Sequence, residues 1–183
     1  MRLIQRAFWF LRHGETDWNA QGLSQGNVDI PLNANGLAQA ARAAEMLRGR
    51  GIITIVASPL SRAHDTAKIA ATPLGLEVEL DEGLREVSFG SHEGQPMSEW
   101  FNDWVAGDFT PPDAEPFIDL RARAVAAVNR ALAKPAPVLV VAHGALFRAL
   151  RAEMGLEPNV RTANAMPFFC QPGAEAWTLT PAG

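Results

Sequence analysis

The chain has 183 residues, a formal net charge of −4 and a single cysteine. A chain of this length fits one domain, and we expect residues 1–183 to form one. The negative charge argues against a nucleic-acid partner, and one cysteine excludes an internal disulfide and a cysteine zinc cluster.

The apolar stretches are too short for a membrane-spanning protein. None approaches the roughly 20 apolar residues that a helix needs to cross a bilayer, so we expect no membrane partner. Met1–Leu11 faintly resembles a signal peptide, but Arg12-His13 stands where a small-residue cleavage site belongs. Cys170 closes an apolar run and is interpreted as a buried, inert thiol. These features suit a reducing compartment, and we expect a cytoplasmic protein.

The first half of the chain predicts apolar strands that alternate with helices. Ala7–Leu11 is a continuous apolar run ending in a polar turn, which is typical of a strand buried on both faces. Further along, we expect a helix over Leu37–Arg48, a buried strand over Ile52–Ala57, a helix capped by Ser61 and running to Ala71, and a short strand over Glu77–Leu80.

The second half continues this alternation after a polar loop at Gly83–Gly94 and a short helix at Met97–Val105. Gly107–Glu115 is rich in proline and aspartate and is expected to be a loop. The remaining predicted elements are a long helix over Phe117–Ala133, a buried strand over Val138–Ala142, a helix over Gly144–Met154, and two final strands over Pro167–Gln171 and Ala176–Thr180.

This order of elements predicts an α/β fold. We expect a three-layer sandwich with a mostly parallel central sheet and helices on both faces. In such sheets the ligand site lies at the carboxyl ends of the strands. Polar residues should therefore gather at that edge.

Three predicted strands end in candidate functional residues. Arg12 and His13 follow the first strand, Arg62 lies just after the second, and His143 and Gly144 follow the long central one. Taken singly, each has an ordinary explanation as a surface arginine or a histidine satisfied by nearby backbone. Because the same pattern recurs on successive parallel strands, we expect the two arginines and two histidines to converge.

Four segments in this order resemble the motifs of the histidine phosphatase superfamily, which has the phosphoglycerate mutase-like fold. They are Leu11–Thr16, Ser58–Ala63, Leu84–Gly90 and Val141–Gly144. The resemblance implies that His13 is the nucleophile that takes the phosphoryl group. It implies that Arg12 and Arg62 neutralise the phosphate dianion, and that a protonated His143 stabilises its oxygens.

The same resemblance assigns the general acid to Glu86. The acid would protonate the leaving alcohol and then take a proton from the hydrolytic water. Spacing alone does not separate this residue from its neighbours Asp81, Glu82 and Glu93. They remain competing candidates.

The candidate substrate-binding residues are Asn19, Gln25 and Gly144. Gln25 falls on a loop that lines the substrate entrance in this family, but a solvated loop glutamine is an alternative. His64 and His92 fall outside the catalytic motifs and have no assigned role. The cluster of Trp100, Phe101 and Trp104 favours helix packing over a lid surface, although the two roles can coexist.

The expected activity is hydrolysis of a small phosphorylated metabolite without a metal or other cofactor. Gln95–Glu115 is too short for the insertion that closes over the substrate of the family's mutases, so mutase activity is the alternative. A non-catalytic phospholigand-binding protein and a metal site of His13, His143 and Glu86 are further alternatives. Neighbouring arginines argue against the metal because they would repel a cation. The sequence is compatible with a homodimer but does not select a substrate or an oligomeric state.

Overall fold

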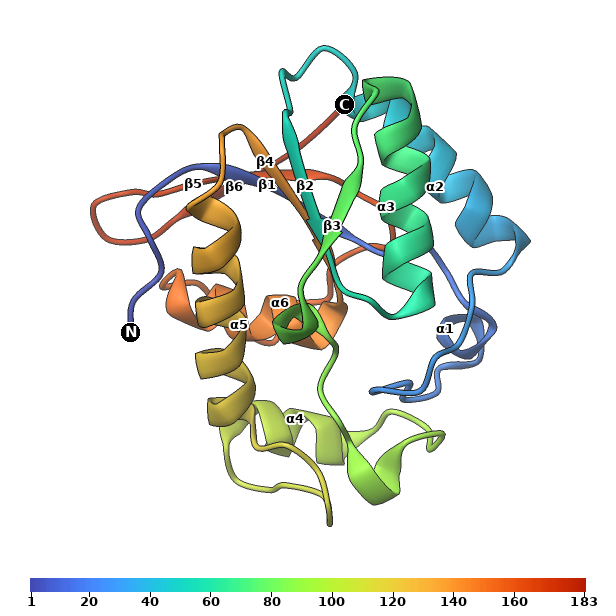
Figure 1. The fold of residues 1–183 in the computed structure, drawn as a ribbon. Helices are drawn as coiled ribbons and strands as arrows, with labels where there is room; N and C mark the ends of the chain where they lie inside the picture. Colours follow the sequence, from blue (N-terminus) through green and yellow to red (C-terminus); the bar gives the residue numbers. More distant parts are fainter.

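A six-stranded sheet forms the centre of the computed structural model, which describes residues 1–183 (Figure 1). Its strands are β1 (Phe8–Arg12), β2 (Thr54–Ala57), β3 (Val78–Leu80), β4 (Val138–Ala142), β5 (Phe168–Gln171) and β6 (Thr178–Pro181). They lie in the order β3-β2-β4-β1-β5-β6. Strands β3, β2, β4 and β1 are parallel, and β5 and β6 add antiparallel pairs at one edge. The predicted, mostly parallel sheet is confirmed.

Helices cover both faces of this sheet (Figure 1). On one face lie α2 (Ala34–Leu47) and α3 (Ser61–Leu74), which contribute to one apolar core. The other core includes α4 (Glu99–Ala106), α5 (Phe117–Leu132) and α6 (Gly144–Glu153). The three-layer architecture is therefore the expected one. None of these helices has an apolar stretch long enough to cross a lipid bilayer.

The continuous apolar runs arise because the inner strands are buried on both faces. In β1, Phe8 and Phe10 pack into the core with α5 and α6, whereas Trp9 and Leu11 pack into the core with α2 and α3. Alternate residues of a strand point to opposite faces, so both sets must be apolar.

The register of the parallel strands places their carboxyl ends side by side. Arg12 pairs with Ala142, and Ala57 pairs with Val141. The residues that follow these strands, including His13 and His143, therefore emerge at the same edge of the sheet. This is the edge at which open α/β sheets bind their ligands.

Three helix starts differ from the sequence prediction, among them that of α4, which begins at Glu99 instead of Met97. Helix α2 begins at Ala34, three residues earlier than expected, because the Asn33 side chain accepts the N–H of Gly36 and caps it. The prediction that Ser61 caps α3 is wrong. Ser61 is the first helical residue, and its N–H donates to the carboxylate of Asp29 at 2.7 Å. That carboxylate supplies the helix start with the acceptor that Ser61 was expected to provide.

Short helical elements also occur where the sequence analysis assigned no helix. Helix α1 (Asp17–Gln21) begins with a capping box in which the Thr16 side chain accepts the N–H of Asn19. A polar residue at the cap and Gly22 in the left-handed region after the last turn were the sequence signals for this helix. The predicted acid loop contains two 3-10 turns, η1 (Glu82–Leu84) and η2 (Gly90–His92).

The loop after β1 packs directly on the backbone of α2. A Cβ atom on Gly36 would overlap the carbonyl oxygen of Glu15, and a Cβ atom on Gly14 would lie 2.5 Å from the carbonyl oxygen of Gly36. Both glycines are needed because only a missing side chain allows two backbone segments to approach this closely. The packing sets the position of the loop that carries His13.

Gly36→Ala should therefore push this loop away from α2. We expect a loss of about 1–3 kcal/mol in the free energy of unfolding from overpacking, with a fall in activity because His13 moves. Urea unfolding and steady-state kinetics measure the two effects. Asn35→Ala, at the exposed neighbouring position, is the matched control. Unchanged stability of Gly36→Ala would show that the loop and helix can separate without cost.

Candidate active site

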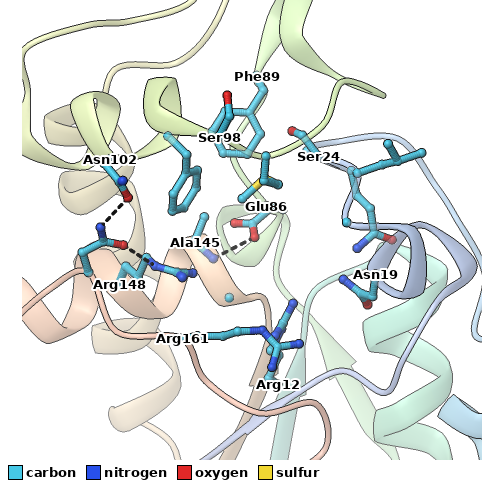
Figure 2. A pocket seen from close by; sticks show the side chains of 18 of the residues that line it. Arg12, Asn19, Ser24, Glu86, Phe89, Ser98, Asn102, Ala145, Arg148 and Arg161 are labelled. Carbon is cyan, nitrogen blue, oxygen red and sulfur yellow. Dashed lines mark hydrogen bonds between the residues drawn. The ribbon is translucent and has the colours of Figure 1, made fainter.

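A cavity of about 570 Å³ opens at the carboxyl edge of the sheet (Figure 2). Its floor includes Arg12, His13 and Arg62, and its walls come from α4, α6 and the loop after α1. Of the residues predicted from sequence, those lining the cavity are Arg12, His13, Asn19, Gln25, Arg62, Glu86 and Gly144. His143 lies behind this surface, with its ring centroid 5.3 Å from that of His13.

The side chain of His13 is held in one tautomer. Its Nδ1 lies 2.6 Å from the carbonyl oxygen of Gly14, which can only accept a hydrogen bond, so Nδ1 carries the proton and Nε2 has the free lone pair. The Gly14 N–H donates to Thr66 Oγ1 at 3.0 Å and ties the loop to α3. His13 is only 2% exposed. Burial, followed by the charges of Arg62 and Arg12, lowers its pKa well below the usual value.

Arg12 and Arg62 are buried cations that have no carboxylate partner. Arg12 Nη1 donates to the carbonyl oxygen of Thr162 at 2.6 Å. Arg62 donates to two carbonyl oxygens, from Nη1 to Val28 at 2.6 Å and from Nη2 to Gly26 at 2.7 Å. The Nε groups of both arginines have no partner within the chain.

Burial lowers the pKa of both guanidinium groups to about 10, so they remain charged at neutral pH. A buried charge without a counter-charge is costly, and this site is therefore built to receive an anion. Gly144 allows Arg12 to lie close, since a Cβ atom at this position would be 3.1 Å from Arg12 Nε.

In the free protein the surroundings of His143 disfavour the protonated form of its ring. Burial is the main cause that lowers its pKa well below the usual histidine value, followed by the charges of Arg62, His13 and Arg12. Its Nε2 lies 2.8 Å from Ser58 Oγ, and its buried Nδ1 has no partner within the chain. Only an added negative charge nearby would favour the protonated ring.

Glu86 is the one acid candidate of the four that lines the cavity. Its Oε2 accepts the N–H of Ala145 at 2.9 Å, and its Oε1 accepts the N–H groups of Val87 and Leu146 at 3.1 and 3.0 Å. Two of these donors belong to the first turn of α6, where the helix dipole favours negative charge. Oε2 keeps a lone pair that can carry a proton.

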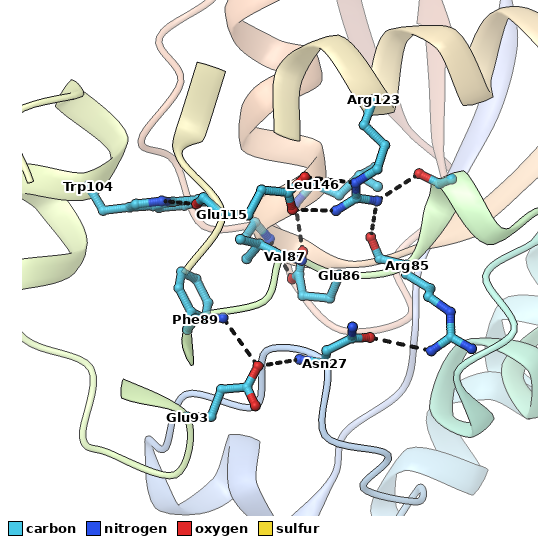
Figure 3. Close-up of polar contacts among 12 residues, drawn as sticks. Asn27, Arg85, Glu86, Val87, Phe89, Glu93, Trp104, Glu115, Arg123 and Leu146 are labelled. Carbon is cyan, nitrogen blue, oxygen red and sulfur yellow. Dashed lines mark hydrogen bonds and ion pairs between the residues drawn. The ribbon is translucent and has the colours of Figure 1, made fainter. Parts of the chain in front are cut away.

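The three competing carboxyl groups are committed elsewhere. Asp81 pairs with Arg130, and Glu82 pairs with Arg85. Glu93 accepts the backbone N–H groups of Asn27 and Phe89 (Figure 3). None of the three lines the cavity.

Arg123 of α5 anchors the loop that carries Glu86 (Figure 3). Its Nη1 donates to the carbonyl oxygens of Gly83 and Arg85 at 2.9 and 2.7 Å, and its other nitrogens pair with the carboxylate of Glu115. A guanidinium group thus fixes the backbone on the N-terminal side of Glu86. These hydrogen bonds hold the loop in place directly before Glu86.

The two candidate amides line the same wall of the cavity, Asn19 from α1 and Gln25 from the loop that follows it. Asn19 Oδ1 accepts the N–H of Thr16 at 3.1 Å and an N–H of Asn164 at 3.3 Å, which leaves its own N–H donors free. Gln25 is buried rather than solvated, and its Oε1 accepts the hydroxyl of Thr16. Both amides line the cavity.

The two remaining histidines lie outside the cavity, and so does Trp104. His92 packs against Trp100 with ring centroids 4.8 Å apart. Trp104 is fully buried in the core, as expected for helix packing, whereas Phe101 of the same helix reaches the cavity. No group of three or more histidine, cysteine, aspartate or glutamate side chains is arranged to hold a metal ion.

Sequence reasoning missed two further cavity arginines, Arg148 and Arg161, together with Asn102 and Asn159. Arg148 is the basic residue of the otherwise apolar first two turns of α6, which was a signal available in the sequence. Arg161 lies in a segment without a predicted element, where no pattern marked it.

Comparisons with known proteins agree on one family. A family model described as histidine phosphatase superfamily (branch 1) matches residues 8–165. The uncharacterized phosphatase PhoE of Bacillus subtilis is 37% identical over 180 residues, covering 94% of this chain and 92% of that protein. A probable phosphoglycerate mutase, GpmB of Yersinia enterocolitica, is 37% identical over 163 residues, covering 82% and 76%.

Solved structures show the same likeness. A mycobacterial glucosyl-3-phosphoglycerate phosphatase in complex with VO3 superposes with a TM-score of 0.82 at 31% identity, covering 95% of this chain and 97% of that one. A phosphoserine phosphatase of Entamoeba histolytica gives a TM-score of 0.81 at 27% identity, covering 95% and 94%.

The lowered histidine pKa values can be tested directly. Because burial and two arginines disfavour the imidazolium form, the rings of His13 and His143 should stay neutral well below pH 6.5, the approximate pKa of an unperturbed histidine. NMR of ¹⁵N-labelled imidazoles during a pH titration measures this, with assignment from single His→Ala variants. Activity should not fall through protonation of His13 until the pH is far below this value. A His13 ring protonated at pH 7 would contradict the electrostatic argument.

Proposed function

Because the chain belongs to the histidine phosphatase superfamily, we propose that it hydrolyses a small phosphate monoester through a phosphohistidine at His13. The observation that carries this proposal is a buried His13 with a free Nε2 lone pair next to two guanidinium groups that lack a counter-charge. The proposed substrate is a small phosphorylated metabolite. We also propose that residues 1–183 act as one domain and, from the single buried thiol of Cys170, that the protein works in the cytoplasm.

Arg12 and Arg62 bind the phosphoryl group. Their carbonyl contacts hold each guanidinium in a fixed orientation, and their remaining N–H groups donate to the phosphoryl oxygens. The free N–H donors of Asn19 extend this set. Since these positive charges are preorganised, they stabilise the negative charge of the transition state without further rearrangement.

In the first step, Nε2 of His13 attacks phosphorus and the bond to the leaving oxygen breaks. Protonated Glu86 donates its proton to that oxygen, so the alcohol leaves neutral. The Gly14 carbonyl accepts the Nδ1 proton and stabilises the positive charge that develops on the ring. The products of this step are the alcohol, phosphohistidine and the carboxylate of Glu86.

In the second step, water attacks the phosphohistidine. Glu86 accepts a proton from the water, the P–N bond breaks, and Nε2 recovers its lone pair. Inorganic phosphate leaves and the carboxyl group is ready for the next cycle. His143 contributes through its contact with His13, and the arriving phosphoryl charge favours its protonated form.

We propose that no metal takes part, because Arg12 and Arg62 supply the positive charge that a divalent cation supplies in other phosphoryl transfers. We also favour hydrolysis over mutase activity. The segment Gln95–Glu115 contains one short helix, α4, and leaves the cavity accessible to water. A mutase must instead protect its phosphohistidine from water.

His13→Ala should abolish the phosphoenzyme and essentially all hydrolysis, because no other group has a free lone pair at this position. Rapid mixing with ³²P-labelled substrate and alkaline quenching should trap an acid-labile, alkali-stable label in the wild-type protein only. His64→Ala, at a position of α3 that does not line the cavity, is the control and should label normally. Turnover should also survive EDTA. A labelled His13→Ala protein, or turnover that needs a divalent ion, would reject the mechanism.

Glu86→Gln should slow the hydrolysis of alkyl phosphates roughly a hundred- to ten-thousandfold, because the leaving alkoxide then lacks its proton donor. The effect on phosphorylation should shrink with p-nitrophenyl phosphate, which has a good leaving group. Dephosphorylation would then limit the rate, so stopped-flow measurements should show a burst of p-nitrophenol.

The control for this variant is Glu99→Gln, which removes the other carboxylate of the cavity. It should retain activity within a few-fold. The glutamine at position 86 places an amide NH₂ near backbone N–H donors, so circular dichroism must confirm folding. If Glu99→Gln loses activity and Glu86→Gln does not, the general acid has been assigned to the wrong side of the cavity.

A further inference from the structure

The cavity carries more positive charge than one phosphoryl group requires. Its charged residues are four arginines and two glutamates, namely Arg12, Arg62, Arg148, Arg161, Glu86 and Glu99. None of the seven ion pairs of the chain involves any of these arginines. The cavity is therefore cationic, although the whole chain has a net charge of −4.

The segment that follows Arg161 holds this residue at the cavity, near the end of β1. The carbonyl oxygen of Thr162 accepts from Arg12, the N–H of Ala165 donates to the carbonyl oxygen of Arg12 at 2.9 Å, and Asn164 Nδ2 donates to the carbonyl oxygen of His13 at 3.1 Å. These bonds fix the segment against the end of β1.

In Figure 2 the side chain of Arg161 extends toward that of Arg12, close enough for its charge to act on it. After burial, its positive charge is the main cause that lowers the pKa of Arg12 to about 10. Arg161 itself is exposed, donates no hydrogen bond to the chain and lines the cavity with its donors open to a ligand. Neighbouring guanidinium groups repel each other, so an anion bound near both is stabilised.

Arg148 extends this positive charge away from the phosphoryl site. Its Nε donates to Asn159 Oδ1 at 3.2 Å, and Asn159 Nδ2 donates to Asn102 Oδ1 at 2.8 Å (Figure 2). Its guanidinium carbon lies 4.8 Å from the ring centroid of Phe101. The side chain is thus held in place, and its two terminal nitrogens remain available to a ligand.

We propose that Arg148 and Arg161 form a second anion site, and that the substrate is a phosphate monoester whose alcohol carries another anionic group. The proposal rests on the proposed function, because the phosphoryl group is taken to occupy Arg12 and Arg62. A carboxylate and a second phosphate share the required chemistry, since a guanidinium fork binds both in bidentate geometry.

The position of Glu86 supports this assignment. Its negative charge acts on Arg12, Arg62 and Arg148, so the carboxyl group lies within electrostatic reach of both anion sites. The leaving oxygen must meet Glu86, so the alcohol extends from this point toward Arg148 and Arg161. Both arginines line the same cavity of about 570 Å³ as the phosphoryl site, so the alcohol is a small molecule.

A set of three-carbon phosphates tests the proposal. Glycerol 3-phosphate and 3-phosphoglycerate differ only in the replacement of CH₂OH by a carboxylate, and 1,3-propanediol bisphosphate offers a second phosphate. We expect kcat/KM for at least one doubly anionic compound to exceed that for glycerol 3-phosphate by roughly 10- to 100-fold, the usual value of a hydrogen bond to a charged group. The better of the two identifies the second group.

Arginine variants then show which residues cause the preference for a second anionic group. Arg161→Gln and Arg148→Gln should each reduce the ratio of the two kcat/KM values roughly 10-fold or more, whereas Arg161→Lys should keep part of it because the charge remains. Arg151→Gln is the matched control, since Arg151 lies on the same helix, outside the cavity, with its Nε bonded to the carbonyl oxygen of Glu157. It should leave both the rates and their ratio unchanged.

Several outcomes would overturn the second site. These are equal rates for charged and neutral substrates, a preference that survives both glutamine variants, or an equal loss on all substrates in Arg161→Gln, which would assign Arg161 to the phosphoryl group.

A failure of the proposed function looks different, because no substrate would then be hydrolysed. In that case, calorimetric titration of the His13→Ala protein with 3-phosphoglycerate and glycerol 3-phosphate still decides the question. Tighter binding of 3-phosphoglycerate that depends on Arg161 supports the second site, and equal affinities reject it.

Discussion

Two guanidinium groups buried next to His13 without a carboxylate partner impose the main constraint on this structure. Taking such charges out of water costs several kcal/mol each, and the chain offsets part of that cost with backbone carbonyls. Arg62 donates hydrogen bonds to the carbonyl oxygens of Gly26 and Val28, and Arg12 donates one to that of Thr162. The loops around the cavity are thus shaped by the need to hold cations whose charge stays available to a phosphate.

The same two cations set the state of the groups around them. Together with burial, their positive charges lower the pKa of His13. The ring stays neutral and keeps the lone pair that the proposed attack on phosphorus needs. A resident carboxylate in contact with Arg12 or Arg62 would cancel this effect and compete with the substrate. Glu86 instead rests on backbone N–H groups at the start of α6, close enough to meet a leaving group. Arg148 and Arg161 continue the unpaired positive charge along the cavity.

The division of roles follows from the parallel sheet. The proposed nucleophile, His13, comes from the end of β1, and Arg62 comes from the helix after β2. The histidine behind them comes from the end of β4, and the carboxyl group comes from the loop after β3. Because neighbouring parallel strands end at one edge, residues more than a hundred positions apart meet there without long insertions. The specificity proposed for Arg148 and Arg161 can then vary without disturbing that edge.

The sequence by itself determined the layers, the strands and most of the residues that surround the phosphoryl site. Those features are local, since apolar runs, helix formers and motif residues at strand ends are each read within a few positions. The family motif favoured Glu86 over Asp81, Glu82 and Glu93, and the tertiary structure adds that Glu86 alone of the four lines the cavity. The tertiary structure also lowers the pKa of His143 in the free protein and brings Arg161 to the cavity. A pKa depends on burial and surrounding charge, and Arg161 reaches the cavity through bonds to residues some 150 positions earlier in the chain.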